Sequence, residues 1–499
     1  MTGPGEQPNI LLLMADQLGA PYLAPYGGPA VAPAIDRLAE EGTVFESAYS
    51  NSPLCAPARF AMMAGQLNSR IGAYDNASEF VSSVPTFAHH LRRGGYQTSL
   101  IGKMHFVGAD QLHGYEERLT TDIYPADFGW TPNWADPETR LDWWFHNLDS
   151  VVHAGVAEAS NQLDFDDEVG FRTVAKLRDL ARSDDKRPWF VTASFTHPHD
   201  PYVARRQFWD RYDPESVPLP EIRAVDDPDP HSRRLAHLMA ADTTTVTDDQ
   251  VRTARHAYLA NISYVDHFVD QIMATLDRLD MRSNTVVLFT ADHGDMLGER
   301  GLWYKMNFFE HSARVPLIIN APGRVPSGRA NTVTSLLDIA PTLLDLAGLT
   351  IPDLMDGASL LGLIDAPDPE RTVVGEFMGE GAIAPIIMIR RGHEKFVWCR
   401  TDPPQLYDLV ADPHELTNLA DHPTHVDQVA GYREEINRRW DLDDLERSVL
   451  ASQQARSTVD QALRQGRFTS WDHQPSTDAA AQYMRNHLDL NQVERSRRV

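Results

Sequence analysis

The sequence is poor in cysteine and contains no long hydrophobic run. Cys55 and Cys399 are its two cysteines among 499 residues, which excludes a disulfide framework and any metal cluster built from cysteine alone. No apolar run approaches the roughly 18 residues of a membrane-spanning helix, and Met1–Pro8 lacks the basic and apolar regions of a secretory signal. These features predict a cytoplasmic protein without a membrane partner.

Basic residues are also scarce. The chain has 45 Lys and Arg against 71 Asp and Glu, a net charge of −26. Nucleic acid needs a basic binding face, so this partner is excluded. The acidic balance is compatible with a cationic or zwitterionic small molecule. At 42% hydrophobic residues, the chain is long enough to form one large α/β domain and a smaller one.

Four short apolar runs divide the first three quarters of the chain. Uninterrupted runs of this length are typical of parallel strands buried on both faces, and helical segments such as Ala34–Glu41 and Val84–Arg93 lie between them. We therefore predict an α/β domain with a central, mostly parallel sheet over residues 8–375. The four runs are residues 10–14, 98–101, 190–195 and 285–290.

Polar side chains follow each of these predicted strands. They are Asp16, Lys103 with His105, His197 with His199, and Asp292 with His293. A single Asp after a strand is usually an ordinary turn residue. Ligands of open α/β sheets bind beyond the carboxyl ends of the strands, so four such ends together predict a functional site at one edge.

The pattern changes after about residue 375. Ile386–Arg390 and Lys395–Cys399 flank a short turn and predict an antiparallel hairpin. Val426–Trp440 and Leu445–Leu463 are predicted amphipathic helices that pack over it, which gives a C-terminal α+β subdomain over residues 376–467. Residues 468–499 have no clear period. They are either a loosely ordered tail or, given their aromatic residues, a segment that docks on a neighbouring subunit of a homo-oligomer, a dimer or tetramer.

The most specific pattern surrounds the first cysteine. Cys55 is followed by Pro57, Arg59 and Gly65, a spacing that differs from the Cys-x5-Arg loop of tyrosine phosphatases. The pattern resembles that of type I sulfatases, in which a maturation enzyme oxidises the cysteine to formylglycine. The chain resembles this family over its whole length, because seven further residues stand in the expected order: Asp16, Lys103, His105, His199, Asp292, His293 and Lys305.

Longer motifs are similar to the choline-sulfatase branch of this family. The resemblance implies an alkaline-phosphatase-like α/β sandwich and hydrolysis of a sulfuric ester, choline O-sulfate, to choline and sulfate. The motifs are residues 74–76, 102–108, 110–114, 121–130, 195–202, 292–303 and 483–487.

The resemblance also implies the chemistry at position 55. A formylglycine aldehyde hydrates to a geminal diol, of which one hydroxyl attacks sulfur and the other allows sulfate to leave. An unmodified thiol or a serine lacks this second exit. One divalent metal ion is implied next to the diol. Its implied ligands are Asp16, Gln17, Asp292, His293 and the side chain of residue 55.

The ligand types bear on the identity of the metal. Two carboxylates and an amide oxygen suit Ca²⁺ or Mg²⁺, whereas the imidazole shifts the preference toward Mn²⁺. We expect Ca²⁺ from the resemblance.

Several cations and histidines complete the implied catalytic set. Arg59 and Lys103 are expected as fixed positive charges beside the diol and the sulfate. Lys305 is implied to lie against the ester oxygen. His105 and His199 are left for general acid and orienting roles.

The substrate contacts are expected from five further residues. Asn76 is expected to donate to a sulfate oxygen, and His197 either binds substrate or is a structural turn histidine. Aromatic faces with a carboxylate hold quaternary ammonium groups. We expect Trp130 as a pocket wall with His146 beside it, and Glu380, by its match to the family, as the carboxylate. Trp134 and Trp143 are expected in the core.

Two other classes of function remain open from the sequence. The same nucleophile and metal serve hydrolases of phosphonate monoesters, phosphodiesters and aryl sulfates in this superfamily. A non-catalytic binder, in which Cys55 stays a thiol, is the second alternative.

Overall fold

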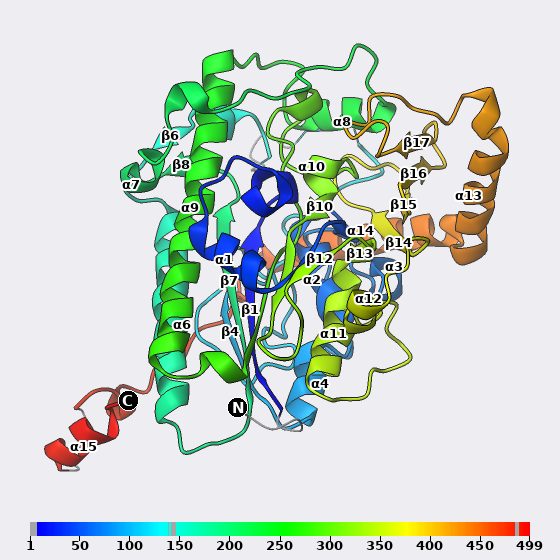
Figure 1. Cartoon of the computed structure of the whole chain (residues 1–499). Coiled ribbons are helices and arrows are strands. Elements are labelled where there is room, and N and C mark those ends of the chain that lie inside the picture. The colour runs from blue at the N-terminus through cyan, green and yellow to red at the C-terminus, as the bar shows by residue number, and fades with distance from the viewer. Residues whose placement is uncertain (1–6, 138, 141–145, 485–488) are drawn as a thin grey trace.

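A single large sheet runs through the centre of the protein (Figure 1). The computed structural model describes residues 7–137, 139, 140, 146–484 and 489–499; Trp143 lies outside them. The sheet has eight strands in the order β12 (Gly328–Ala330), β2 (Thr43–Phe45), β11 (Leu317–Asn320), β9 (Thr285–Ala291), β1 (Asn9–Asp16), β7 (Trp189–Pro198), β4 (Gln97–Gly102) and β5 (Glu117–Arg118).

The four strands predicted from apolar runs are neighbours in this sheet. β1 pairs in parallel with β9 and β7, and β4 pairs in parallel with β7 and β5. β11 is antiparallel to both β9 and β2. The prediction of a central, mostly parallel sheet is therefore confirmed.

Helices cover both faces of the sheet, which explains why the strands are apolar throughout rather than alternating. One face carries α1 (Pro33–Glu41), α6 (Asn161–Arg182) and α9 (Asp248–Arg278), and the other carries α2 (Cys55–Ala64), α4 (Phe87–Arg93) and α11 (Ile339–Leu346) (Figure 1). α4 begins later than predicted because the Thr86 side chain caps its first turn. The other helices before the C-terminal subdomain are α3 (Asn68–Ile71), α5 (Asp149–Val152), α7 (Arg206–Trp209), α8 (Pro230–Leu238), α10 (Glu310–Ala313) and α12 (Leu361–Asp365).

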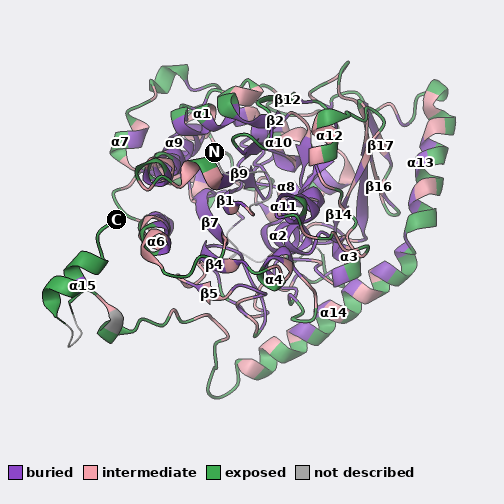
Figure 2. Ribbon diagram, turned by 60° about the horizontal axis from the view of Figure 1, so that its bottom comes forward, coloured by how far each residue is buried: buried purple, intermediate pink, exposed green. Residues whose placement is uncertain are grey.

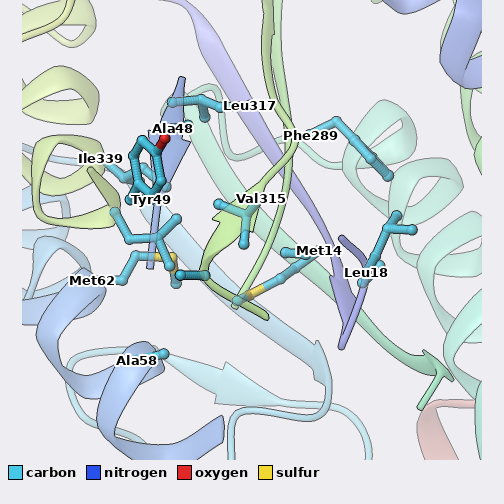
Figure 3. Close-up of a cluster of buried hydrophobic side chains, with 14 of the residues drawn as sticks. Met14, Leu18, Ala48, Tyr49, Ala58, Met62, Phe289, Val315, Leu317 and Ile339 are labelled. Atoms are coloured by element: carbon cyan, nitrogen blue, oxygen red, sulfur yellow. The ribbon is translucent and has the colours of Figure 1, made fainter. Parts of the chain in front are cut away.

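A buried cluster locks helix α2 against the sheet. Met14 near the end of β1, Met62 of α2, Val315 of β10 (Arg314–Val315) and Ile339 of α11 surround one another in Figure 3, and all four are fully buried. Because the helix that begins at Cys55 is packed in this way, its first residue has a fixed position relative to the strand ends. Two small sheets complete this domain, β10 with β3 (Ala48–Tyr49) and β13 (Thr334–Ser335), and β6 (Gly155–Val156) with β8 (Val203–Ala204).

The predicted C-terminal hairpin is present in a four-stranded antiparallel sheet. Its order is β14 (Thr372–Phe377), β15 (Ile386–Arg391), β16 (Glu394–Cys399) and β17 (Gln405–Asp408). α13 (Val426–Arg439) packs on it, with the Tyr432 ring stacked on Phe396 at a centroid separation of 5.0 Å.

Helix α14 (Leu442–Leu463) departs from the sequence prediction. An ion pair of 2.8 Å between Arg400 and Glu446 ties its first turns to the end of the hairpin. Beyond that point α14 runs along the large domain, where Gln453 and Arg456 are buried (Figure 2). The expectation that both helices pack over the hairpin thus holds for α13 and only for the start of α14.

The first part of the C-terminal tail packs against residues 126–128 of the same chain. The Trp471 ring lies 5.2 Å from Phe128, and the Asp472 carboxylate accepts from the Ala126 backbone N–H at 2.8 Å. α15 (Leu490–Ser496) lies at the margin of the molecule (Figure 1), and Arg497 directly after it pairs with Asp179 of α6 at 3.5 Å. Among the described residues, no helix combines the length and apolar character required to cross a bilayer.

Candidate active site

The four central strands deliver charged side chains to one edge of the sheet. Asp16 ends β1, Lys103 follows β4, His199 follows β7 and Asp292 follows β9, and each is essentially fully buried. Gly102 makes one of these turns possible. Its φ is +100°, and a Cβ there would lie 2.0 Å from the Ser194 carbonyl oxygen, so only glycine can bring the chain round to Lys103 at this point.

Cys55 is the first residue of helix α2. Its side chain therefore lies at the positive end of the helix dipole. The Asn76 side-chain oxygen accepts from the Ala56 N–H at 3.0 Å, which leaves the Asn76 amide N–H groups as donors. Cys55 Sγ lies 3.2 Å from His293 Nε2 and 3.8 Å from Asp16 Oδ1.

Arg59, one turn further along α2, connects several strand ends. Its guanidinium donates to Asp292 Oδ2 and to Asp16 Oδ2, both at 2.8 Å. It also donates to the Lys103 carbonyl at 2.6 Å and to Ser194 Oγ at 2.9 Å. These bonds direct Arg59 toward the two carboxylates. They allow it to orient Asp16 and Asp292, and its expected place beside the diol and the sulfate stays a prediction.

Asp16 is ionised in spite of its burial. Burial alone would raise the pKa of Asp16, but the charges of Lys103 and Arg59 outweigh it and hold that pKa well below its usual value. Lys103 Nζ lies 2.5 Å from Asp16 Oδ2. A buried carboxylate with two buried cationic partners is stable where an unpaired one would not be.

Lys305 and His199 form a second, hydrogen-bonded pair. Burial would lower the pKa of Lys305, but Cys55, Asp200 and Asp16 outweigh it, so the amine stays charged. Burial and then the Lys305 charge lower the pKa of His199 well below its usual value. His199 Nδ1 lies 2.6 Å from the Asp200 carbonyl oxygen and must donate to it, so its Nε2 accepts from Lys305 Nζ at 2.8 Å.

His105 packs against two aromatic rings next to Lys103. Its φ is +59°, an uncommon conformation for a non-glycine residue, and burial followed by the Lys103 charge lowers its pKa to about 3. The rings of Tyr124 and Trp130 lie 5.2 and 5.6 Å from its ring. The Tyr124 ring also covers Lys103 Nζ at 4.3 Å. Tyr124 lies inside the motif of residues 121–130, but the sequence analysis did not place it in the site.

Gln17 has its amide group oriented by charged neighbours. Its Nε2 donates to Asp295 at 2.6 Å and to Asp200 at 3.3 Å, and its Oε1 accepts from Lys305 at 2.5 Å. Carboxylates only accept and an ammonium only donates, so the carbonyl oxygen must face Lys305. The sequence analysis did not single out Asp200 and Asp295, although both lie inside motifs that carried the resemblance. Burial raises the pKa of Asp200 to about 7 and also raises the pKa of Asp295.

The donor set fits a divalent metal ion. Ligand atoms of Asp16, Cys55, Asp292 and His293 all lie within 4.8 Å of one another. Burial lowers the pKa of His293 to about 4, so its imidazole is neutral at pH 7. Its Nδ1 lies 3.0 Å from the Gly294 carbonyl oxygen and donates to it, which directs the Nε2 lone pair toward Cys55. Carboxylates with a neutral, oriented imidazole are the environment of a bound divalent cation.

A cavity of about 230 Å³ adjoins this cluster. Glu380, His146, Trp134, Thr131 and Met306 are among its lining residues. Glu380 is 6% exposed, and its carboxylate oxygens find no hydrogen-bond partner among the described residues. Burial raises the pKa of Glu380 to about 8. The His146 ring lies 6.0 Å from that of His199, so the cavity opens toward the charged cluster.

The remaining predicted substrate residues lie in two other places. Trp130 packs on Tyr124 at 4.9 Å, on the His105 side of the site, while Trp134 is the tryptophan that lines the cavity with Glu380. His197 Nδ1 lies 2.7 Å from Asp166. This contact matches the structural alternative raised for His197 from the sequence.

Comparisons with known proteins identify the class of this site. The family model described as Sulfatase matches residues 8–349. Two further models match later parts of the chain. One is described as N-sulphoglucosamine sulphohydrolase, C-terminal, and matches residues 298–441; the other is described as Choline sulfatase enzyme C terminal and matches residues 447–499. The chain belongs to the sulfatase family and is an enzyme of that family.

Individual relatives show which sulfatases the chain resembles in sequence. The chain is 51% identical to the choline-sulfatase of Rhizobium meliloti (strain 1021), across 99% of this chain and 98% of that protein. It is 28% identical to an arylsulfatase of Clostridium perfringens, across 85% of this chain and 92% of that protein. The resemblance to sulfatases, and to choline-sulfatase within them, is therefore confirmed.

Solved structures agree on the alkaline-phosphatase-like fold. The crystal structure of the phosphonate monoester hydrolase of Agrobacterium radiobacter superposes with a TM-score of 0.69 at 25% identity, across 89% of this chain and 96% of that chain. A 2-O GAG sulfatase gives a TM-score of 0.68 at 24% identity, across 89% and 93% of the two chains, which shows the shared fold alone.

The donor set generates a prediction about metal binding. Asp292→Asn keeps the shape of the side chain but removes one of two buried negative charges, so it should weaken binding of added Ca²⁺ or Mn²⁺ by at least the roughly 10–100-fold that loss of an outer-shell partner costs. Elemental analysis and titration calorimetry measure this. Asp270→Asn, on an exposed ion pair of α9, is the control. An Asp292→Asn protein with the metal content and affinity of the unmodified chain would contradict the assignment.

Proposed function

We propose that this enzyme hydrolyses choline O-sulfate to choline and sulfate. The observation that carries the proposal is Glu380, a buried carboxylate without a hydrogen-bond partner among the described residues, in a cavity beside a cluster rich in buried cations. A trimethylammonium group has no N–H donor, so an aromatic face and a negative field are what can recognise it. The 51% identity to a choline-sulfatase over nearly the whole chain supports the same substrate.

We propose that a maturation enzyme converts Cys55 to formylglycine. Burial raises the pKa of the Cys55 thiol to about 12, and a protonated thiol is a poor nucleophile. The hydrated aldehyde supplies both a hydroxyl that attacks sulfur and a second hydroxyl whose deprotonation releases the sulfate.

We propose one divalent ion, Ca²⁺ with Mn²⁺ and Mg²⁺ as alternatives, held by Asp16, Gln17, Asp292, His293 and residue 55. Bound there, it supplies charge neutralisation at the sulfate oxygens and lowers the pKa of a coordinated hydroxyl. Gln17 contributes its amide oxygen, whose orientation is fixed by the contacts with Lys305, Asp200 and Asp295.

Polar side chains of the protein bind the sulfate, orient the metal ligands and donate the proton to the leaving group. Lys103 and the Asn76 amide N–H bind the sulfate, while Arg59 holds Asp16 and Asp292 in place. The Lys305–His199 pair provides the proton for the departing alcohol oxygen, since Lys305 stays charged and hydrogen-bonds to His199 Nε2 at 2.8 Å. Such a proton transfer contributes roughly 10²–10⁴ in rate.

Hydrolysis of aryl sulfates, phosphonate monoesters or phosphodiesters is the alternative. The nucleophile region does not discriminate among these esters, and the structural similarity to a phosphonate monoester hydrolase supports the comparison. A parallel assay of choline O-sulfate, an aryl sulfate and a phosphodiester decides between them. A buried carboxylate in the pocket favours the cationic ester.

We further propose a cytoplasmic homo-oligomer, a dimer or tetramer, that binds neither nucleic acid nor membranes. Both cysteines are buried and unpaired, which is compatible with a reducing compartment. The tail exposes Phe468 and Tyr483, at 47% and 73% of their surface, and such aromatic residues favour a neighbouring subunit as its partner.

The nucleophile is tested by mass spectrometry and one substitution. The peptide that contains residue 55 should be lighter by the difference between a CH₂–SH and a CHO group. Cys55→Ser should lose turnover while its thermal unfolding resembles that of the unmodified chain. Turnover of Cys55→Ser at the original rate would show that the diol is not required.

The prediction that Trp130 contacts the cation is tested by Trp130→Ala, since the structure places Trp130 on Tyr124 and Trp134 in the lining of the Glu380 cavity. A desolvated cation–π contact of 1–2 kcal/mol corresponds to roughly five- to thirtyfold in binding, so the KM for choline O-sulfate should rise by about that factor. The KM for a neutral aryl sulfate should change far less, because its ring needs no cation site. Equal losses for the two esters would make Trp130 a packing residue.

The raised pKa of Glu380 predicts that the KM for choline O-sulfate depends on pH. Below pH 8 its carboxyl group is largely protonated in the free enzyme, because burial raises its pKa to about 8. A cationic head group favours the ionised form, so binding releases a proton and the KM for choline O-sulfate should fall as the pH rises toward 8. Glu380→Gln should remove this slope, measured relative to an aryl sulfate on the same enzymes. A slope that persists in Glu380→Gln would assign the titration to another group.

A further inference from the structure

The wall of the pocket is an irregular segment. Residues 121–137 form no helix or strand, yet they carry Trp130, Thr131 and Trp134. A segment of this length with no regular structure needs other parts of the chain to fix its conformation. Its support comes from helix α14, more than 300 positions further along the sequence.

The buried face of α14 is apolar in the first half of the helix and polar in the second half. Leu442, Leu445 and Val449 are buried in its first half, and Gln453 and Arg456 continue the same three-and-four spacing in its second half. Gln453 and Arg456 are each only 5% exposed. A buried polar side chain is costly unless it is hydrogen-bonded. Arg456 and the Gln453 side-chain oxygen both meet partners, whereas Gln453 Nε2 has none among the described residues.

Gln453 holds the part of the pocket wall nearest the carboxylate. Its Oε1 accepts from the Trp134 backbone N–H at 2.9 Å. The Trp134 indole N–H then donates to the Gly379 carbonyl at 3.1 Å, directly before Glu380. Gly379 is itself confined, because a Cβ there would lie 2.7 Å from the Leu54 side chain. One hydrogen-bonded path therefore runs from α14 to the residue next to Glu380.

Arg456 reaches the other end of the site. It donates to both oxygens of Asp75, at 2.6 and 2.7 Å, and to Thr131 Oγ1 at 3.3 Å. Asp75 is fully buried and directly precedes Asn76, whose side chain bonds the Ala56 N–H at the start of α2. A bidentate arginine–carboxylate pair fixes direction as well as distance.

We propose that Gln453 and Arg456 are positioning residues, through which the C-terminal helix sets the geometry of both ends of the substrate site. Gln453 fixes Trp134 and the Gly379–Glu380 corner, so it governs recognition of the cationic group. Arg456 fixes Asp75 and Asn76, so it governs the sulfate end. The identity of the cation rests on the proposed function, whereas the positioning of residues 126–137 does not.

The two residues should give different kinetic signatures. Gln453→Met keeps the volume of the side chain and removes the acceptor, and a net hydrogen bond corresponds to about three- to tenfold in binding. Its KM for choline O-sulfate should rise by that factor with kcat little changed and with a smaller effect on an aryl sulfate. Arg456→Lys keeps the charge but loses the bidentate geometry, so it should lower kcat/KM for both esters alike.

Two further measurements keep the proposal testable. Hydrogen–deuterium exchange of peptides within residues 126–137 should accelerate in Gln453→Met, at a global unfolding temperature close to that of the unmodified chain. Arg447→Gln, on an exposed arginine of the same helix with 71% of its side chain accessible, should change neither exchange nor kinetics.

The outcomes separate the two proposals. No hydrolysis of choline O-sulfate by the mature, unmodified enzyme would overturn the proposed function, and the exchange data would still decide the positioning. Unchanged exchange in Gln453→Met, or a KM that rises equally for both esters, would overturn the role of Gln453. An Arg456→Lys enzyme with the kinetics of the unmodified one would overturn the role of Arg456.

Discussion

Arg59 joins two carboxylates that would otherwise repel each other in the interior of the protein. Asp16 and Asp292 end neighbouring strands, and both are fully buried. Two such charges are stable only where hydrogen-bonded cations compensate them, and the guanidinium of Arg59 does so with bonds of 2.8 Å to each. Because Arg59 lies one turn after Cys55 on α2, the same bonds hold the start of that helix against the strand ends. The position of residue 55 thus depends on this ion pair.

The protonation states around this pair suit an anion. Lys305 keeps its charge because Cys55 and the nearby carboxylates outweigh the effect of burial on its pKa. His105 and His199 have lowered pKa values, mainly through burial, and are neutral. The positive charge is therefore held by lysine and arginine at fixed positions, and preorganised charge of this kind requires little rearrangement when substrate binds. The opposite charge arises at the Glu380 cavity when a bound cationic group favours the ionised carboxylate, whose pKa burial raises to about 8, so the occupied site has the polarity of a zwitterion.

The central strands, and the polar residues at their carboxyl ends, were predictable from local sequence patterns. Parallel strands covered on both faces must be apolar throughout, as in residues 10–14 and 285–290, and their carboxyl ends share an edge. The hairpin at residues 386–399 was predictable because a short turn separates two apolar segments. Tyr124, Asp200 and Asp295 were missed as site residues. Their roles arise from contacts such as the Tyr124 ring over Lys103, which no pattern in the neighbouring sequence records.

The packing partners of α14 were unpredictable for the same reason. They explain how this chain combines a sulfate-binding end typical of sulfatases with an end that recognises one kind of leaving group. An amphipathic pattern shows that a helix has a buried face, but not what covers it, and Gln453 and Arg456 appear polar in sequence while they are buried in the structure. The sulfate end is built from strand ends and α2, within the region matched by the general sulfatase model. The wall of the cationic end is irregular backbone of residues 121–137. It is held by Gln453 and Arg456, which lie within the region matched by the C-terminal choline sulfatase model, residues 447–499. Since an irregular wall has no hydrogen-bonded ladder of its own, the helix that supplies its missing partners also determines which leaving group the pocket can accommodate.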